Sequence, residues 1–531
     1  MCGIAGCIGG NDFETIQRML DALPHRGPND RGIHRYGEFV FGHTRLSIVD
    51  VAKGHQPILA KEGRAGIICN GEIYNFQAIR RRLSEKYPFS TQSDSEVILY
   101  LFLEKGPDCI HDLDGMFAFA LYDEARFMLA RDPIGIKPLY YGYKNDRFYF
   151  SSELGAMSLS GVPEVHEFPP GHYYTPDGGF QQYYQVPRAR DFLLTDIDHS
   201  CELIRSTLTH AVSKRLLSDK EIHVGSFCSG GLDSSLIAAL AAREIPNLHT
   251  FAVGMRDENG RESDDLIAGR LAAEHIGATH HEYIITEEEY YQVLPTVIRK
   301  LETYDPSLVR CAVPCYFTCK LAAEYVTVVL TGEGADEIFA GYHYMKRYAP
   351  DQVNLESRRL IQGVHNINLQ RADRMGMLFS LELRVPFFDT AMIELGMQIS
   401  PEIKIVEKDG EKIEKWILRQ AFDGTGLLPR EVLWRYKVQY TQGAGCEHLG
   451  EKLAEKELSD ADVEKIKHSH PGAVINSKEA AYYFRIFREH HPQDSVLNSI
   501  GIWTGFDFAE ERQKVSGTME DKPHQPPCTI P

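Results

Sequence analysis

Residues 221–240, EIHVGSFCSGGLDSSLIAAL, constrain the fold of this chain more than any other stretch. A β-rich run ending at Cys228 enters the loop SGGLDSS, and an apolar helical pattern over residues 234–243 follows it. Gly230 and Gly231 allow a tight turn, and the free amides at a helix start point with its positive dipole end into the same concavity. We therefore predict an anion-binding loop between a strand and a helix.

The composition of this loop narrows the kind of anion site. The loop has no lysine, so it does not match the Gly-x-x-x-x-Gly-Lys-Ser/Thr pattern. Asp233 instead places a carboxylate beside the expected phosphate, which is favourable only if a metal ion shields the two charges. The alternative is an ordinary turn rich in glycine and serine, but Asp233 and the flanking elements favour a phosphate site.

Strands and helices alternate through the second half of the chain. Predicted strands in VGSFC, HTFAVGM and HHEYII are each followed by a helix, the later two over residues 264–276 and 287–301, and a strand in VTVVLTG closes the series. Buried β-branched strands separated by helices are typical of a parallel, doubly wound α/β sheet. Ligands of such a sheet bind at the carboxyl ends of its strands, where both SGGLDSS and TGEGADE (331–337) fall.

The first 190 or so residues have a different pattern. Short β-like runs separated by Gly, Asp and Asn turns suit antiparallel sheets with packed inner faces. Three helical segments stand apart, residues 12–23, residues 76–83 and SDSEVILYLFLEKG, which opens on a capping signal. The pattern predicts an α+β domain in which helices cover the sheets.

We divide the chain accordingly. The α+β domain spans residues 2–190, a linker spans 191–202, and the α/β domain spans 203–510, mostly helical from about residue 350. The Pro-rich, polar residues 511–531 are expected to be disordered.

Composition excludes several classes of partner. The formal net charge of −18 disfavours a nucleic-acid partner, because phosphate backbones are bound through excess lysine and arginine. No apolar run approaches a membrane span, and the first residues lack a signal-peptide pattern. Eleven cysteines in 531 residues do not resemble a disulfide scaffold, so we expect a cytoplasmic protein. Cys311, Cys315 and Cys319 invite an iron–sulfur interpretation, but their spacing favours one stripe along a helix.

Cys2 is a candidate nucleophile. Removal of Met1 would leave Cys2 with both a thiol and a free α-amino group. An α-amine has an unperturbed pKa near 8, so it can accept the thiol proton without a separate histidine.

Four motifs near the amino terminus support this interpretation: HRGP (25–28), GHTRLS (42–47), NGEIYN (70–75) and SDSE (93–96). With them the sequence resembles the class II glutamine amidotransferases, whose glutaminase domain is an N-terminal nucleophile (Ntn) hydrolase fold, an αββα sandwich. The resemblance implies that Cys2 attacks the glutamine side-chain amide and that Asn70 and the Gly71 amide form the oxyanion hole. Arg45 would hold the α-carboxylate, and Glu72 and Asp94 the α-ammonium group. The implied glutamine-binding set is Arg45, Leu46, Ser47, Ile48, Val49, Asn70, Gly71, Glu72 and Asp94.

From residue 203 to about 487 the chain resembles the glutamine-hydrolysing asparagine synthetase family. The matching stretches include FCSGGLDSS, ETYDPSLVR, LTGEGADEIFAGY, LELRVPFFD and EKWILRQAF. The resemblance implies an adenine-nucleotide α-hydrolase-like ATP pyrophosphatase domain that cleaves ATP to AMP and pyrophosphate. The implied ATP site comprises Cys228, Ser229, Gly230, Gly231, Asp233, Ser234, Val253, Thr331 and Gly332.

The same resemblance assigns roles to five charged residues. Asp233 and Asp336 would hold Mg²⁺ against the phosphates, and Arg310 would contact pyrophosphate. Glu333 would support formation of β-aspartyl-AMP, and Lys437 would stabilise the tetrahedral species as ammonia attacks. Taken singly, Arg310 and Lys437 could instead be surface charges, and Glu333 and Asp336 could cap a helix.

If ammonia is made at one site and used at another, it must be transferred between them. Ammonia released into neutral water is protonated to ammonium and is no longer a nucleophile. The family resemblance implies an internal dry channel, with Met116 and Arg384 as candidate wall residues; core packing and a structural ion pair are the alternatives. The chain departs from the usual family pattern at Thr441-Gln442-Gly443, where Ser-Asp-Gly is usual, at residues 306–309 and at Thr331. A glutamine at position 442 replaces a carboxylate and leaves the acceptor open.

The leading hypothesis is a glutamine-dependent asparagine synthetase that amidates ATP-activated aspartate. An amidotransferase acting on another carboxylate is the alternative among enzymes, and a catalytically silent sensor is the alternative of another class. The intact Cys2, Asp233, Glu333, Asp336 and Lys437 argue against a sensor. The sequence leaves the oligomeric state open, and a homodimer is one candidate.

Overall fold

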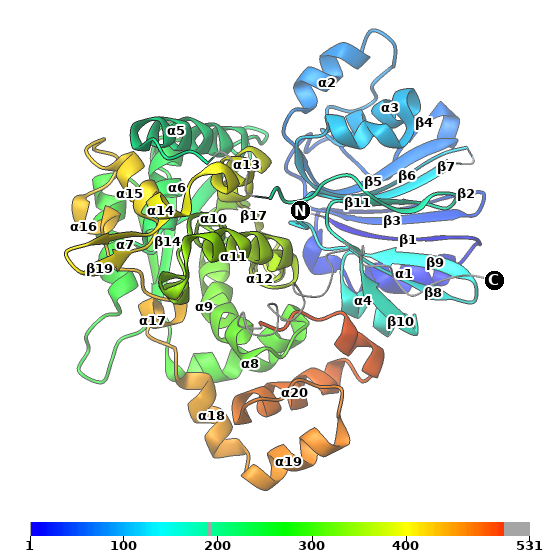
Figure 1. The fold of residues 1–531 in the computed structure, drawn as a ribbon. Helices are drawn as coiled ribbons and strands as arrows, with labels where there is room; N and C mark the ends of the chain where they lie inside the picture. The colour runs from blue at the N-terminus through cyan, green and yellow to red at the C-terminus, as the bar shows by residue number, and fades with distance from the viewer. Residues whose placement is uncertain (1, 125, 189–192, 504–531) are drawn as a thin grey trace.

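The computed structural model describes residues 2–124, 126–188 and 193–503 (Figure 1). The tail predicted over residues 511–531 lies outside the described residues, as do residues 189–192, which include the end of the predicted first domain and the start of the predicted linker. Helix α5 begins at Ile197, so the rest of that linker is partly helical.

Two six-stranded antiparallel sheets stack in the amino-terminal domain (Figure 1). The order of the first sheet is β10 (Glu164–Glu167), β8 (Tyr140–Lys144), β9 (Arg147–Ser151), β1 (Gly3–Ile8), β3 (Phe39–Arg45) and β2 (Asp30–Tyr36). The order of the second is β12 (Gly179–Gln182), β11 (His172–Thr175), β7 (Arg126–Arg131), β6 (Gly115–Asp123), β5 (Ala65–Ile73) and β4 (Ile58–Ala60).

Helices cover the outer faces of these sheets. Helices α1 (Phe13–Asp21) and α4 (Leu154–Leu159) pack on the first sheet, and α3 (Glu96–Lys105), with α2 (Phe76–Leu83) beside it, packs on the second. Between the sheets lies an apolar layer rich in aromatic rings, including Phe41, Tyr122 and Phe150. The predicted αββα sandwich is confirmed.

The capping signal predicted before α3 is wrong. Ser95 makes no side-chain capping bond, and the Glu96 carboxylate accepts hydrogen bonds from Ser90 and Thr91 instead. The Asp94 carboxylate accepts a hydrogen bond from the Ile73 amide of β5, so it binds the neighbouring strand.

A five-stranded, all-parallel sheet forms the centre of the second domain. Its order is β15 (Thr279–Ile284), β14 (His249–Gly254), β13 (Val224–Phe227), β16 (Val328–Leu330) and β17 (Glu382–Arg384). Val328 and Leu330 face one apolar core and Val329 another, so both faces of the sheet are covered. The helices of this part are α5 (Ile197–Lys214), α6 (Leu232–Ala242), α7 (Asp264–His275), α8 (Glu287–Leu301) and α9 (Pro306–Ala322).

The predicted doubly wound sheet is confirmed, with two differences. Strand β17 follows the strand predicted to close the series; it has only three residues, two of them charged, and carries no β-type pattern. Helix α6 begins at Leu232, two residues before its predicted start, with Gly231 as the N-cap. Asp233 therefore lies in the first turn of α6.

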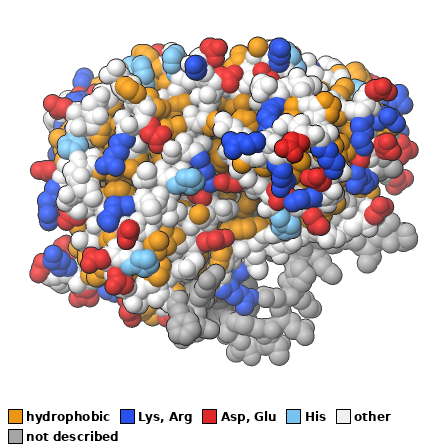
Figure 2. All heavy atoms as spheres, turned by 90° about the horizontal axis from the view of Figure 1, so that it is seen from above, with side chains coloured by type: hydrophobic (Ala, Val, Ile, Leu, Met, Phe, Trp, Pro, Cys, Tyr) orange, Lys and Arg blue, Asp and Glu red, His pale blue; other side chains and the backbone are white. Residues whose placement is uncertain are grey.

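The rest of the chain is mainly helical, as predicted. The hairpin β18 (Val406–Lys408) and β19 (Glu411–Ile413) interrupts the helices α10 (Ala335–Phe339), α11 (Pro350–Gly363), α12 (Asn368–Met377), α13 (Thr390–Gln398), α14 (Pro401–Lys404), α15 (Trp416–Phe422), α16 (Arg430–Leu433), α17 (Tyr440–Ala444), α18 (Leu449–Glu457), α19 (Asp460–Ser469) and α20 (Lys478–His490). Within the described residues, no helix has the length and apolarity needed to cross a bilayer. On the face shown in Figure 2, basic and acidic side chains are interspersed.

Candidate functional site

The thiol of Cys2 lies at the start of β1, close to the loop that follows β3. Its sulfur is 3.8 Å from the Leu46 carbonyl oxygen, and its backbone nitrogen donates to Asn70 Oδ1 at 2.9 Å. Burial raises the pKa of the Cys2 thiol above its usual value. Asn70 is fully buried on β5, and its Nδ2 has no hydrogen-bond partner, so this amide is free to donate to a bound oxyanion.

Gly71 follows Asn70 where β5 runs against β6. A Cβ at this position would stand 2.1 Å from the Met116 carbonyl oxygen, so only glycine fits. The strand register pairs Gly71 with Phe117 and Glu72 with Met116, which presents Asn70, Gly71 and Glu72 at one end of the sheet.

Two buried carboxylates border this site. Burial, with Glu382 and Asp94 nearby, raises the pKa of Glu72 well above its usual value, and burial raises the pKa of Asp94 to about 6. Glu72 Oε2 has no hydrogen-bond partner, and the Arg384 guanidinium is 3.7 Å from the other oxygen. A cationic ligand group bound here would stabilise the ionised forms of both carboxyl groups and so lower their pKa values.

Arg45 ends β3 and organises the loop that follows. Its guanidinium donates to the carbonyl oxygens of Val49 at 3.2 Å, Asp50 at 2.6 Å and Val51 at 3.2 Å. The same loop reaches the second domain, since the Asp219 amide donates to the Ile48 carbonyl. The structure thus brings the predicted residues 45–49, 70–72 and 94 together around Cys2.

The second predicted site lies where the sheet order changes direction, between β13 and β16. The loop after β13 is held internally, with the Ser229 amide donating to Ser234 Oγ at 3.2 Å. Gly230 has φ +70°, and a Cβ there would stand 2.2 Å from the Ala268 backbone. A Cβ on Gly332, after β16, would stand 2.6 Å from the Ser234 amide, so the two loops are in close contact.

Asp233 and Asp336 meet at one ammonium group that the sequence analysis missed. Lys415 Nζ lies 2.5 Å from Asp233 Oδ2 and 2.6 Å from Asp336 Oδ1, and Lys437 Nζ lies 2.7 Å from Asp336 Oδ2. Although burial alone would raise it, the pKa of Asp336 is held well below its usual value by the two lysines. Asp233 Oδ1 is buried and has no hydrogen-bond partner.

Lys415 carries no local motif that could have identified it. It lies in EKWILRQAF, which matches the family stretch, but its partners are 182 and 79 positions away. Only the fold brings this lysine to the two carboxylates.

Glu333 and Arg310 are each paired with a charge that was not predicted. Arg371 of α12 forms an ion pair with Glu333, and Thr331 Oγ1 accepts from the Glu333 amide at 3.4 Å. The Arg310 guanidinium on α9 is held by Glu479 of α20, with Nε 2.9 Å from Oε1. Arg310 is thus held by α20 in the free protein.

Apolar side chains lie between the two sites. Leu46, Ile48 and Met116 of the first domain belong to the same core cluster as Cys228 and Leu232 of the second. Met116 is fully buried, and Arg384 is fully buried in an ion pair with Glu382 at 2.7 Å. Arg384 also donates to the carbonyl oxygens of Arg215 and Leu217. The structural ion pair that was one interpretation of Arg384 is therefore present.

The remaining predicted positions are also placed. Val253 is buried on β14, and Gln442 on α17 donates to Glu447 at 2.9 Å near the surface. Cys311, Cys315 and Cys319 lie on α9, as the helical-stripe interpretation predicted, with the last two sulfurs 4.0 Å apart. That helix begins at Pro306 and contains Pro314. Among the described residues, no three His, Cys, Asp or Glu side chains are arranged as a metal site.

Comparisons with known proteins cover almost the whole chain. Residues 1–180 match the glutamine amidotransferase domain family, and residues 203–357 and 349–485 match the asparagine synthase family. Asparagine synthetase (glutamine-hydrolyzing) 1 of Arabidopsis thaliana is 36% identical over 527 residues, 93% of this chain and 88% of that protein. A probable asparagine synthetase (glutamine-hydrolyzing) of Dictyostelium discoideum is 35% identical over 545 residues, 95% of this chain and 96% of that protein.

Similarity to solved structures is weaker. A glutamine phosphoribosylpyrophosphate amidotransferase from B. subtilis, complexed with ADP and GMP, is 21% identical, with a TM-score of 0.32. The match covers 48% of this chain and 67% of that chain.

Proposed function

The chain belongs to the family of glutamine-hydrolysing asparagine synthetases, and from that premise we propose that it makes asparagine from aspartate, ATP and glutamine. Glutamate, AMP and pyrophosphate are the other products. The observation that carries the proposal is the single apolar core that joins the surroundings of Cys2 to the loop at Cys228.

The first site would release ammonia. After removal of Met1, the α-amine of Cys2 takes the thiol proton, and the sulfur attacks the glutamine side-chain carbonyl carbon. The unpartnered Asn70 amide and the Gly71 N–H stabilise the oxyanion. Collapse of the tetrahedral adduct breaks the carbon–nitrogen bond, and the departing nitrogen takes the proton held by the Cys2 α-amine and leaves as ammonia. Water then hydrolyses the remaining thioester, which gives glutamate and restores the thiol.

The ends of the glutamine would be recognised by charge. Glu72 and Asp94 take the α-ammonium group, in agreement with their raised pKa values in the free protein. Arg45 takes the α-carboxylate, with the loop 46–49 enclosing the ligand.

The second site would activate the acceptor. Loop 228–234, Val253, Thr331 and Gly332 bind ATP, and the aspartate side chain attacks the α-phosphate to give β-aspartyl-AMP and pyrophosphate. Glu333 supports this step, and Arg310 contacts pyrophosphate after leaving Glu479. Lys437 stabilises the tetrahedral species when ammonia displaces AMP.

Asp233 and Asp336 are suited to Mg²⁺. Both carboxylates reach the same ammonium group, and Mg²⁺ at nucleotide sites is held by one or two carboxylates together with phosphate oxygens. The ion would neutralise charge on the leaving pyrophosphate. Lys415 keeps the two carboxylates together when nucleotide is absent.

Ammonia transfer between the sites would pass along the apolar residues around Met116, where water is excluded and ammonia stays unprotonated. We place the enzyme in a reducing cytoplasm, because all ten described cysteines are free. A homodimer stays a prediction.

The acceptor is tested by pyrophosphate release. With ATP and Mg²⁺, aspartate should stimulate release, whereas glutamate and other dicarboxylates should not. The control is the variant Asp336→Asn, which should release none. Release with another carboxylate and not with aspartate would assign the chain to a different acceptor, the alternative that Gln442 at a usually acidic position leaves open.

A further inference from the structure

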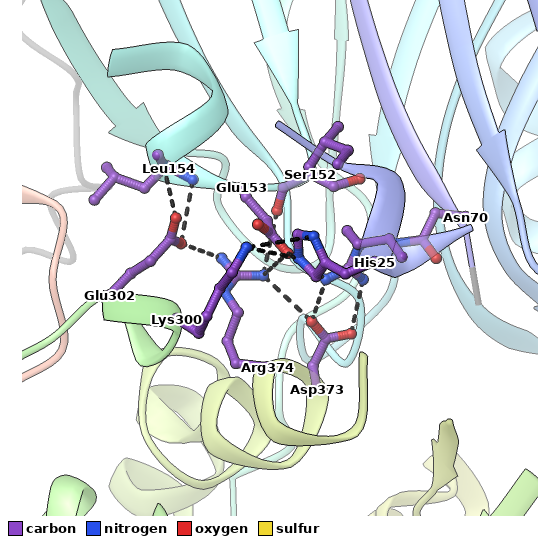
Figure 3. A network of polar contacts seen from close by, with 12 residues as sticks. His25, Asn70, Ser152, Glu153, Leu154, Lys300, Glu302, Asp373 and Arg374 are labelled. Atoms are coloured by element: carbon purple, nitrogen blue, oxygen red, sulfur yellow. Dashed lines mark hydrogen bonds and ion pairs between the residues drawn. The ribbon is translucent and has the colours of Figure 1, made fainter. Parts of the chain in front are cut away.

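Helix α12 carries buried charges that reach the first domain. Arg26 is fully buried; its guanidinium binds both oxygens of Asp373, at 2.7 and 3.0 Å, and its Nε donates to the Cys2 carbonyl oxygen at 3.0 Å. Figure 3 shows Asp373 and Arg374 extending from α12 towards Glu153 and His25 of the first domain. One side of α12 is thus two hydrogen-bonded contacts away from the nucleophile.

The opposite side of the same helix faces the second site. Arg371 precedes Asp373 by two residues, so the two side chains leave the helix about 200° apart. Arg371 forms the ion pair with Glu333 described above. A single element therefore contacts a residue at the second site on one face and a residue beside the first site on the other.

Helix α12 is buried along nearly its whole length. All residues from Leu369 to Met377 are buried, and a packed interior transmits displacement rather than absorbing it. Arg374, the neighbour of Asp373, pairs with Glu302 at 2.6 Å, which ties α12 to the end of α8. A change at Glu333 would displace Asp373 along with Arg371.

We propose that α12 couples the two sites, with Asp373 as a positioning residue that sets the reactivity of Cys2 through Arg26. This inference rests on the proposed function. When Glu333 engages the activated acceptor, its pairing with Arg371 changes, the helix shifts, and Arg26 alters its hold on the Cys2 carbonyl. Glutamine is then hydrolysed fastest when an acceptor awaits the ammonia. Because such coupling is reciprocal, bound glutamine changes nucleotide affinity by the same factor.

The test compares Asp373→Asn with Glu302→Gln. Both changes remove one charge from a buried carboxylate–arginine pair of α12, but only Asp373 touches Arg26. Glutamate release is measured with glutamine alone and with ATP, Mg²⁺ and aspartate added, and asparagine formation from ammonium is measured on the same preparations.

In the wild type, the additions should accelerate glutamate release by a factor typical of allosteric coupling, about 5- to 150-fold. Asp373→Asn should lose most of this acceleration and form more than one glutamate per asparagine, while its synthesis from ammonium is retained. Glu302→Gln should keep the acceleration.

Three results would overturn the role of α12: no acceleration in the wild type, full acceleration in Asp373→Asn, or equal loss in both variants. Absence of acceleration in the wild type overturns the role of α12 even if a variant does not fold. Failure of the wild type to make asparagine from ammonium would instead overturn the proposed function, and this inference with it.

Discussion

At the scale of single residues, the site around Cys2 contains polar groups that lack a full set of partners in the free protein. Glu72 and Asp94 are buried with raised pKa values, and Asn70 keeps an amide without a partner. Such groups cost stability in the free protein. Bound glutamine would supply the partners: its α-ammonium group for the two carboxylates, and the oxyanion formed during its hydrolysis for the Asn70 amide.

The pKa of Asp94 predicts an acid limb for glutamine hydrolysis. Below a pKa of about 6, Asp94 is protonated and loses the negative charge that attracts the ammonium group, so kcat/KM for glutamine should rise with pH through this range. We expect a value at pH 5 roughly tenfold below the plateau. Thermal unfolding at each pH controls for loss of the fold, and a flat profile between pH 5 and 7 would count against the assignment.

Lys415 is expected to hold two carboxylates that would otherwise repel each other. Lys415→Met should lower the free energy of unfolding by about 3–5 kcal/mol, because it leaves the Asp233 carboxylate without a counter-charge, whereas Asp336 keeps Lys437. Mg²⁺ should restore part of that loss and stabilise the variant more than the wild type, as measured by thermal unfolding with and without Mg²⁺. Equal effects of Mg²⁺ on both proteins would show that the ion does not bind between Asp233 and Asp336.

At the scale of elements, the loop after β13 depends on a close approach of two backbones. Gly230 has φ +70° and no room for a Cβ, whereas Gly277 has φ +68° with no atom within 4 Å of a Cβ. The two glycines share a backbone conformation and differ in space, so they form a matched pair.

Alanine substitution at each glycine should separate the energetic cost of the positive φ from that of steric overlap. Gly277→Ala should destabilise the protein by about 1 kcal/mol through the unfavourable φ alone. Gly230→Ala should cost roughly 1–3 kcal/mol more through steric overlap, and it should raise KM for ATP. Denaturant unfolding measures the first effect and pyrophosphate release the second. Equal destabilisation by both changes would contradict the contact with Ala268.

Elements with a strong pattern were predictable, and those made by tertiary contacts were not. Helices α2 and α8 have the bounds that the sequence predicted, because each presents a periodic apolar face. Strand β17 was missed because Glu382 and Arg384, which look like surface residues, neutralise each other in the interior. The start of α6 was misplaced because Gly231, rather than a serine, occupies its N-cap.

At the scale of the whole molecule, contacts between the two domains also could not be predicted from the sequence, because they join residues far apart in the chain. The site residues around Cys2 could be predicted from motifs, and so could the meeting of Asp233 with Asp336 at neighbouring strand ends. The charged run Arg371–Arg374 of α12 could not be placed, since a helix with three charges in four residues normally faces solvent. It is buried here because its partners come from elsewhere, Arg26 and Glu302 among them.

In the proposed function, one chain carries two separate sites, one that produces ammonia and one that consumes it. The most direct test is asparagine formation by Cys2→Ala, supplied with ATP, Mg²⁺ and aspartate and with either glutamine or ammonium. We predict loss of synthesis from glutamine and retention of synthesis from ammonium at the wild-type rate. Loss of both activities in a folded variant, or continued synthesis from glutamine, would contradict the account.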